Sequence, residues 1–193
     1  MRKLHPALAA LTCAAILAGC SSTEGSGGTT KTNESAKPSA QLNLTDIPGQ
    51  FLQPSTLTDA GESLAPVHSC VNVGGAANRA ELTIVDCGSK RHTYWVVRRV
   101  VTPDQCGDTD RPFYNNTAEG GEWTACLDLA WDNSHCMDIR KFDVFKVDCN
   151  AESKYRKLKP IKIITGAVTA TDCPGIGFPH PARRFTICAE IVN

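Results

Sequence analysis

The chain has 193 residues with 20 basic and 20 acidic side chains, and 41% of its residues are hydrophobic. Nucleic-acid binding needs a basic surface that neutralises phosphates, and charge-driven recruitment to anionic lipid needs a polybasic segment. The balanced charge argues against both functions, and we expect no nucleic-acid partner.

The first residues of the chain are organised as a secretory signal peptide. Arg2 and Lys3 give a basic start, an almost wholly apolar stretch follows, and the chain becomes polar directly after Cys20. Basic, apolar and small-residue regions in this order are typical of exported proteins. Leu17-Ala18-Gly19-Cys20 resembles the end of a bacterial lipoprotein signal, in which the cysteine becomes the acylated N-terminus. We therefore expect a signal peptide at 1–19 and lipidation, with palmitate, at Cys20.

This segment has two alternative interpretations. A transmembrane helix needs about 20 apolar residues, and the apolar run from Ala7 to Gly19 is shorter. A signal peptide that is cleaved without lipidation remains the other alternative. Lipidation would place the protein on the extracytoplasmic face of the cell membrane, because two or more buried acyl chains give stable anchoring to a lipid bilayer.

Residues 20–65 are expected to form the acylated N-terminus and a flexible spacer. The segment is rich in Ser, Thr and Gly, and such a composition buries too little apolar surface to offset the entropy of ordering. Leu42-Asn43-Leu44 and Gln50-Phe51-Leu52 are two apolar islands that could instead dock on the folded domain or on a partner.

Residues 66–193 are predicted to form a duplicated domain, with copy one at 66–131 and copy two at 132–193. Cysteine-centred blocks recur in the same order in both copies. Ile84-Val85-Asp86-Cys87, for example, returns as Lys146-Val147-Asp148-Cys149. Differences in spacing between the blocks belong in loops, which tolerate length changes.

The cysteines of this domain are expected to form disulfides. An even number in an exported chain indicates a disulfide framework, and the absence of a Cys-x-x-Cys pair argues against zinc knuckles and thioredoxin-like chemistry. Equivalent bridging in both copies leaves three patterns. In a predicted first hairpin, antiparallel pairing places the first two cysteines opposite each other, and the other two would join a loop to the fourth strand. The expected bridges are Cys70–Cys87, Cys106–Cys126, Cys136–Cys149 and Cys173–Cys188.

The predicted secondary structure is mostly strand. Residues 81–85, 93–101, 142–147 and 161–165 are rich in β-branched and aromatic side chains, which favour strands. Thr102-Pro103 could open one short helical turn. The predicted fold class is therefore mainly β: two tandem, disulfide-stapled, pseudo-repeated small β units with little helix.

The signal, the spacer and the twin Cys-Val, Val-Asp-Cys and Thr-x-Cys motifs together resemble the LppU-type actinobacterial lipoproteins. Each copy is also similar, more loosely, to the small cysteine-paired septum-formation domains. The resemblance implies an envelope lipoprotein and the architecture described above. It implies no established activity and no catalytic residue.

A basic cluster in copy two is the candidate anion-binding site. It occupies a stretch that is longer than its counterpart in copy one, and its members are Lys154, Arg156, Lys157 and Lys159. A protruding basic loop could contact anionic lipid, a phosphate-bearing wall polymer or an acidic protein. The alternative is an ordinary solvated face.

No other residues predict a reaction. His68 and His135 stand at corresponding places, but without the spacing of a metal site, so we expect structural or surface histidines. Asp86 and Asp148 are explained as turn residues, and Trp123 and its counterpart Phe185 as core residues. We predict no catalytic residue, no metal site and no cofactor.

The expected function is therefore that of a non-enzymatic envelope lipoprotein that binds a protein or a small ligand. An envelope protein or a cell-wall component is the expected partner. One alternative is an enzyme, or an enzyme's accessory subunit, acting on wall or lipid precursors. The other is a structural envelope protein.

Overall fold

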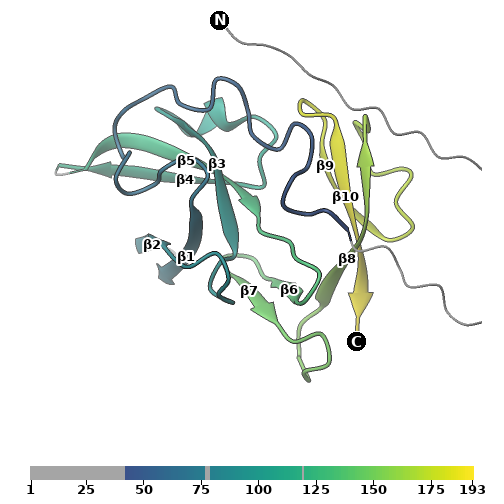
Figure 1. Ribbon diagram of the computed structural model, residues 1–193. Coiled ribbons are helices and arrows are strands. Elements are labelled where there is room, and N and C mark those ends of the chain that lie inside the picture. The colour runs from purple at the N-terminus through teal and green to yellow at the C-terminus, as the bar shows by residue number, and fades with distance from the viewer. Residues whose placement is uncertain (1–41, 77–78, 119) are drawn as a thin grey trace, which may run out of the picture. The chain divides into compact units, whose positions relative to one another are not determined.

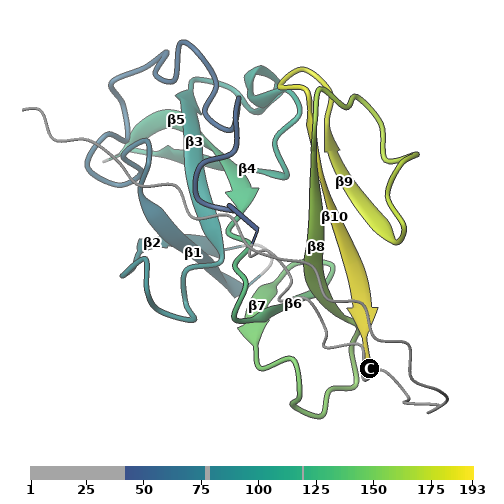
Figure 2. The same ribbon diagram turned by 45° about the vertical axis from the view of Figure 1, so that its right-hand side comes forward.

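The computed structural model describes residues 42–76, 79–118 and 120–193, which contain ten strands in two antiparallel sheets. The first sheet, module one, consists of β1 (Cys70–Ala76), β2 (Arg79–Ile84), β3 (Tyr94–Val100), β4 (Arg111–Thr117) and β5 (Gly121–Leu129). The second sheet, module two, consists of β6 (Cys136–Ile139), β7 (Val144–Val147), β8 (Lys157–Thr165), β9 (Ile176–His180) and β10 (Phe185–Val192). The two modules lie side by side (Figures 1 and 2), so the predicted fold class is confirmed.

The topology of the sheets confirms the duplication. Module one has the strand order β2-β1-β3-β5-β4 and module two has β7-β6-β8-β10-β9, which is the same order for corresponding strands. A register shift also recurs: it lies opposite Cys126 in the β3–β5 pair and opposite Cys188 in the β8–β10 pair. Such a bulge bends the strand and increases its twist. Both sheets therefore have the same irregularity at corresponding positions.

All four expected disulfides are present, with Cα–Cα distances of 5.0–5.3 Å. One bridge of each module closes its first hairpin, and the other joins a loop to the last strand. That strand is the fifth of each module and not the fourth, because β4 and β9 form additional edge strands. Both carry a proline, and β4 also carries two asparagines, which are poor strand formers except at sheet edges.

The short helical turn expected after β3 is also present, as the 3₁₀ helix η1 (Pro103–Cys106). Gln105 closes its first turn, because its side-chain oxygen accepts hydrogen bonds from the backbone N–H groups of Val101 and Thr102, both at 3.0 Å. Pro103 occupies a position at which a missing N–H is tolerated. The turn places Cys106 beside β5 for its bridge to Cys126.

The segment 42–65, which we call the strap, is packed against the domain. Leu44 and Ile47 are each only 4% exposed and belong to the main core. The flexible-spacer prediction is therefore wrong for residues 42–65, because a few apolar side chains concentrated in a polar segment suffice to dock it. Residues 20–41 lie outside the described part of the chain.

The strap is fixed to β3 through backbone and side-chain hydrogen bonds. Leu57 N–H donates to Arg99 O, and Arg99 N–H donates to Ser55 O, both at 2.8 Å. The buried Arg99 side chain adds donations to the carbonyls of Thr58 and Ala65. In Figures 1 and 2 the dark-blue strap runs over module one and between the two sheets.

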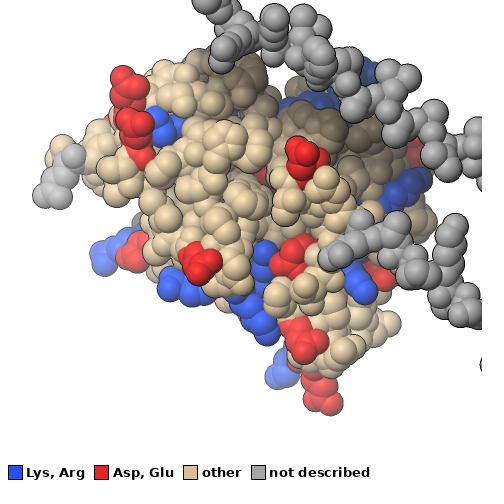
Figure 3. Space-filling view, in the orientation of Figure 1, with Lys and Arg blue, Asp and Glu red and all other residues tan. Residues whose placement is uncertain are grey.

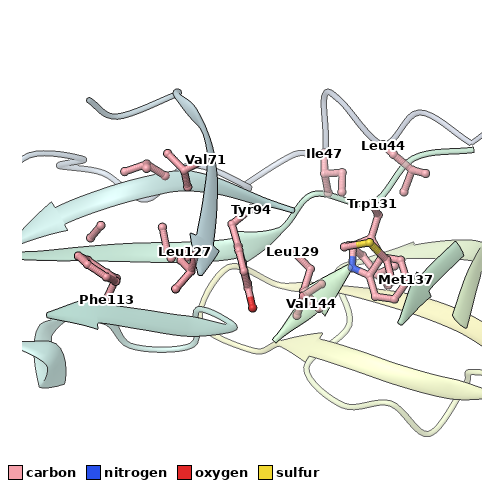
Figure 4. Close-up of a cluster of buried hydrophobic side chains, with 14 of the residues drawn as sticks. Leu44, Ile47, Val71, Tyr94, Phe113, Leu127, Leu129, Trp131, Met137 and Val144 are labelled. Atoms are coloured by element: carbon pink, nitrogen blue, oxygen red, sulfur yellow. The ribbon is translucent and has the colours of Figure 1, made fainter. Parts of the chain in front are cut away.

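The two modules share one hydrophobic core. Val71, Phe113 and Leu127 of module one are continuous with Met137 and Val144 of module two in a single cluster of buried side chains (Figure 4). The core role expected for Trp123 and Phe185 is confirmed, since each is 1% exposed. Neither module therefore builds its core alone. No helix among the described residues is long and apolar enough to cross a bilayer.

Candidate ligand-binding cleft between the modules

A cleft of about 360 Å³ opens where the two modules meet. Module one contributes the start of β3, the start of β4 and the end of β5, and module two contributes the β6–β7 hairpin and β9. Its lining residues are Tyr94, Asp110, Arg111, Leu129, Ile139, Arg140, Lys141, Val144 and Phe178. Ligand sites occur preferentially at such junctions and commonly combine apolar walls with a few polar groups.

The walls of the cleft are apolar. Tyr94, Leu129 and Val144 are at most 7% exposed and present only part of their surface to the cleft. Figure 4 shows these three side chains close together at the junction of the modules. Ile139 and Phe178 are half-buried and complete the walls. Because all five belong to strands, the walls are held by sheet hydrogen bonds and not by a loop.

Three cationic side chains line the cleft. Arg111 Nη1 donates to Phe142 O at 2.7 Å and lies 3.4 Å from the Tyr94 hydroxyl. Arg140 is paired with the buried Asp138 at 2.7 Å. Lys141 is exposed, with its Nζ 5.0 Å from the centre of the Phe142 ring. Arg140 is thus neutralised by a neighbour, whereas Arg111 bonds only uncharged groups among the described residues.

Asp110 is the one carboxylate among the described residues that line the cleft. Its side chain is 15% exposed, its Oδ2 accepts a hydrogen bond from Leu129 N–H at 2.8 Å, and its Oδ1 lies 3.9 Å from His180 Nε2. Burial, together with the negative charge of Asp128, raises the pKa of Asp110 to about 6. This carboxyl therefore changes charge in a mildly acidic range.

Behind the cleft, a buried arginine joins both modules and the strap. Arg183, in the turn between β9 and β10, pairs with both oxygens of Asp128 on β5 and with Asp108 Oδ1 at 3.0 Å. It also donates to Gln50 O of the strap at 2.7 Å. Burial alone would lower the pKa of Arg183, but Asp128 and Asp108 raise it. We call Arg183, Asp108, Asp128 and Gln50 the arginine hub.

A second charged group lies within copy two, between the residues that precede β6 and strand β7. Lys146 on β7, whose side chain is 5% exposed, pairs with Asp132 at 2.9 Å, and His135 Nδ1 lies 3.1 Å from the same carboxylate. Burial opposes ionisation of Asp132, but Lys146 and His135 hold its pKa at about 2. Burial and the charge of Lys146 lower the pKa of His92 in module one to about 4.

Other surface depressions are less suited to a ligand. One of about 380 Å³ lies between the start of the strap and residues 131–134, and one of about 300 Å³ lies between β2 and β4. Each is lined by a single charged side chain, Asp132 or Glu81. The cleft between the modules alone, among these three, combines apolar walls, several cations and a carboxyl with a raised pKa, which together mark functional sites.

The candidate anion-binding cluster of the sequence does not present all four of its cations to solvent. Lys157 is 2% exposed and its Nζ donates to the carbonyls of Cys149 and Ala151, at 2.7 and 2.6 Å. Its inclusion was wrong, because the ammonium group is used inside the protein to hold the β7–β8 loop. Lys154 and Arg156 are exposed on that loop and Lys159 is half-buried on β8.

The two acidic residues expected in turns, Asp86 and Asp148, are found there. Asp86 and Asp148 each accept a hydrogen bond from a backbone N–H two residues later, at 2.8 and 2.9 Å, as turn residues do. Asp128, in contrast, is 3% exposed and belongs to the arginine hub. Within the described ranges, no group of three or more His, Cys, Asp or Glu side chains could hold a metal ion.

The sequence did not single out the residues of the cleft. Arg111 stands about thirty residues before Arg140 and Lys141, and no motif connects it with them. The duplication was the one sequence feature that could have indicated the cleft, because ligand sites occur preferentially at junctions between packed units. Cys20, the expected lipidation site, lies outside the described residues.

Comparisons of the chain with protein-family models, curated proteins and solved structures found no match.

Proposed function

We propose that this protein is a lipid-anchored lipoprotein of the cell envelope, related to the LppU type, whose folded body binds a ligand without chemical turnover. The observation that carries the proposal is the cleft between the modules, with five apolar wall residues beside Arg111, Lys141 and Asp110. The ligand is a small molecule or a short segment of an envelope protein or wall component.

The construction of the cleft favours binding. Its walls come from strands that share a core and are crosslinked by four disulfides. A site of this kind needs little rearrangement to accept a ligand, and preorganisation increases affinity because less ordering entropy is lost.

One observation favours the enzymatic alternative. A carboxyl with a pKa of about 6, as Asp110 has, can act as a general acid or base near neutral pH. Among the described residues, no serine or cysteine lines the cleft as a partner nucleophile, and the apolar walls beside the cations favour binding. Turnover of a wall or lipid precursor that is lost in Asp110→Asn would reverse this preference.

The binding proposal is tested on the mature chain held in lipid nanodiscs, with empty nanodiscs as the reference. A library of neutral, anionic and cationic fragments is screened by saturation-transfer NMR. Ile139→Trp fills the cleft, and Val168→Trp adds the same ring at a position that is 48% exposed and outside it. We expect a subset of fragments to bind the native chain and Val168→Trp but not Ile139→Trp. An absence of hits, or hits that Ile139→Trp leaves unchanged, would refute the proposal.

The anchor is tested separately by growing the producing cells with an alkyne-labelled palmitate. We expect label on the native protein and none on Cys20→Ser, which should also leave the membrane fraction. Native protein that carries no label would contradict the proposed lipidation. A structural envelope protein, the remaining alternative, would depend on Cys20 but not on the cleft.

A further inference from the structure

We propose that the cleft takes small amphipathic anions, with an apolar body between the modules and one carboxylate or phosphate group held by Arg111 and Lys141. This inference rests on the proposed binding function and specifies the ligand's chemistry. The shared chemistry is an oxyanion attached to a compact apolar group.

The apolar half of the argument comes from the walls. Their five apolar side chains project from both sheets into a space of about 360 Å³, at the small end of the range of about 300–1,000 Å³ typical of ligand pockets. A body the size of one or two fused rings fits such a volume better than a long acyl chain. Burial of that body supplies affinity without selecting a charge.

The charged half comes from two cations that are not neutralised. No carboxylate among the described residues forms a salt bridge with Arg111 or Lys141. Arg140, by contrast, is paired with Asp138 and lies over the rings of Phe145 and Tyr155, at 4.6 and 3.9 Å. Arg111 is anchored through Nη1 alone, which leaves the rest of its guanidinium to pair with an oxyanion in a two-pronged geometry.

Figure 3 shows Lys and Arg side chains together with Asp and Glu at the lower centre of the molecule, over the region of β6 and β7 in Figure 1. This face therefore carries both signs of charge, and the chain's formal net charge is zero. Selection of an anion must come from the local arrangement inside the cleft, where three cations face one carboxylate.

Asp110 opposes an anionic ligand and makes its binding depend on pH. The groups that face it are Asp128 on β5, His180 on β9, Arg183 beyond β9, the neighbouring Arg111 and the Tyr94 hydroxyl. With a pKa of about 6, Asp110 is mostly charged at pH 7.5 and mostly neutral at pH 5. Its neutralisation removes the one repulsive charge of the lining, so an anion binds more tightly in mildly acidic solution.

The test uses four probes with the same ring system: 2-naphthoate, 2-naphthyl phosphate, 2-naphthamide and 2-naphthylmethylammonium. Each is titrated calorimetrically into the mature chain in nanodiscs, with empty nanodiscs as the reference. We expect at least one oxyanion to bind about tenfold more tightly than the amide and the ammonium. The ratio of naphthoate to naphthyl phosphate identifies the preferred head group.

Matched variants locate the head group. Arg111→Gln and Lys141→Gln should each weaken oxyanion binding about tenfold, whereas Arg156→Gln and Lys154→Gln, on the exposed β7–β8 loop, should not change it. Near-UV circular dichroism verifies that each variant is folded. Asp110→Asn should bind the oxyanion on the order of fivefold more tightly at pH 7.5 and should lose most of the gain seen between pH 7.5 and pH 5.

The outcomes separate this inference from the proposed function. Equal binding of the amide or the ammonium, abolished by Ile139→Trp, would overturn the anion preference and leave the cleft as a binding site. Oxyanion binding that Arg111→Gln and Lys141→Gln leave intact would also overturn it. A failure of both oxyanions to bind at millimolar concentration overturns the inference, and the fragment screen then decides whether the cleft binds anything.

Discussion

At the scale of single residues, the most consequential side chain of the molecule is Arg183. Its guanidinium contacts Asp128 and Asp108 of module one and Gln50 of the strap, and its side chain is 2% exposed. A buried charge is tolerated because both carboxylates and a carbonyl satisfy it. One residue thereby fixes the relation of three parts of the chain.

Replacement of Arg183 should expose this dependence. Arg183→Met leaves two carboxylates without their partner, so the free energy of unfolding should fall by about 3–5 kcal/mol. The measurement is urea unfolding followed by near-UV circular dichroism. Arg156→Met, at an exposed arginine, serves as the control and should stay within about 0.5 kcal/mol. Equal stability of the two variants would show that the hub contributes little.

Two other residues make stability depend on pH in opposite senses. Asp110 has a pKa raised from 3.8 to about 6, so it stabilises the folded state at low pH and loses that contribution as pH rises to 6. His92 has a pKa lowered from 6.5 to about 4, so its contribution is present above pH 6.5 and is lost as pH falls toward 4. In the native protein the two effects partly cancel.

Single substitutions should separate the two effects. In Asp110→Asn, the free energy of unfolding should rise from pH 4 to pH 6.5. In His92→Gln it should fall from pH 4 to pH 6. Each change should be on the order of 1–2 kcal/mol, after allowance for solvent screening. Denaturant unfolding at several pH values measures both, with the exposed Asp104→Asn as the control. Identical slopes in the two variants would contradict the assignment.

At the scale of elements, the strap is the feature that differs most from expectation. Two of its contacts leave no room for a side chain: a Cβ at Gly61 would lie 2.3 Å from the Trp123 ring, and one at Gly49 would lie 2.7 Å from Arg183 O. Both glycines have positive φ, at 75° and 84°, a conformation that glycine adopts without strain. The backbone of the strap therefore packs directly against the Trp123 ring and the Arg183 carbonyl.

A buried strap residue should matter for stability. Ile47→Ala should lower the free energy of unfolding by about 2–5 kcal/mol, because Ile47 is 4% exposed within the main core. Leu57→Ala, on the same strap at 43% exposure, should cost less than about 1 kcal/mol. Thermal unfolding of the two variants gives the comparison. Similar values would mean that the strap is not docked in solution.

At the scale of the whole molecule, the two modules have separate sheets but a common core. Tyr94, Leu129 and Trp131 connect the cluster of module one with that of module two, and the arginine hub adds charged contacts. A unit of about 60 residues alone builds only a marginal core. The shared core is larger than either module could build alone. The same packing creates the junction at which the cleft lies.

The shared core predicts a single cooperative unfolding transition. Backbone amides of β3 in module one and of β8 and β10 in module two should lose hydrogen-exchange protection at the same urea concentration. Mass spectrometry of peptides from each module measures this directly. Two transitions, with one module protected after the other has opened, would show that the modules fold independently.

The β class, the duplication and all four disulfide pairings could be predicted from the sequence. These features follow from local patterns. The strands 94–100 and 157–165 carry β-branched side chains, which favour strands. Equivalent bridging in both copies reduces the number of possible cysteine pairings to three. Sequence reasoning failed where the outcome depends on distant partners. The strap, with its polar composition, is ordered because Leu44 and Ile47 find a core that the rest of the chain builds.

The candidate site, in contrast, could be located only in the folded structure. The basic run around Lys157 suggested an anion site by composition, but burial turned that lysine inward to bind carbonyl groups. Arg111 and Lys141 stand 30 positions apart in the chain and line one cleft because the β6–β7 hairpin packs against the start of β4. Whether a charged side chain can bind a ligand depends on the groups that surround it in the folded protein. The spacing of residues along the sequence does not show which side chains lie together when two modules pack.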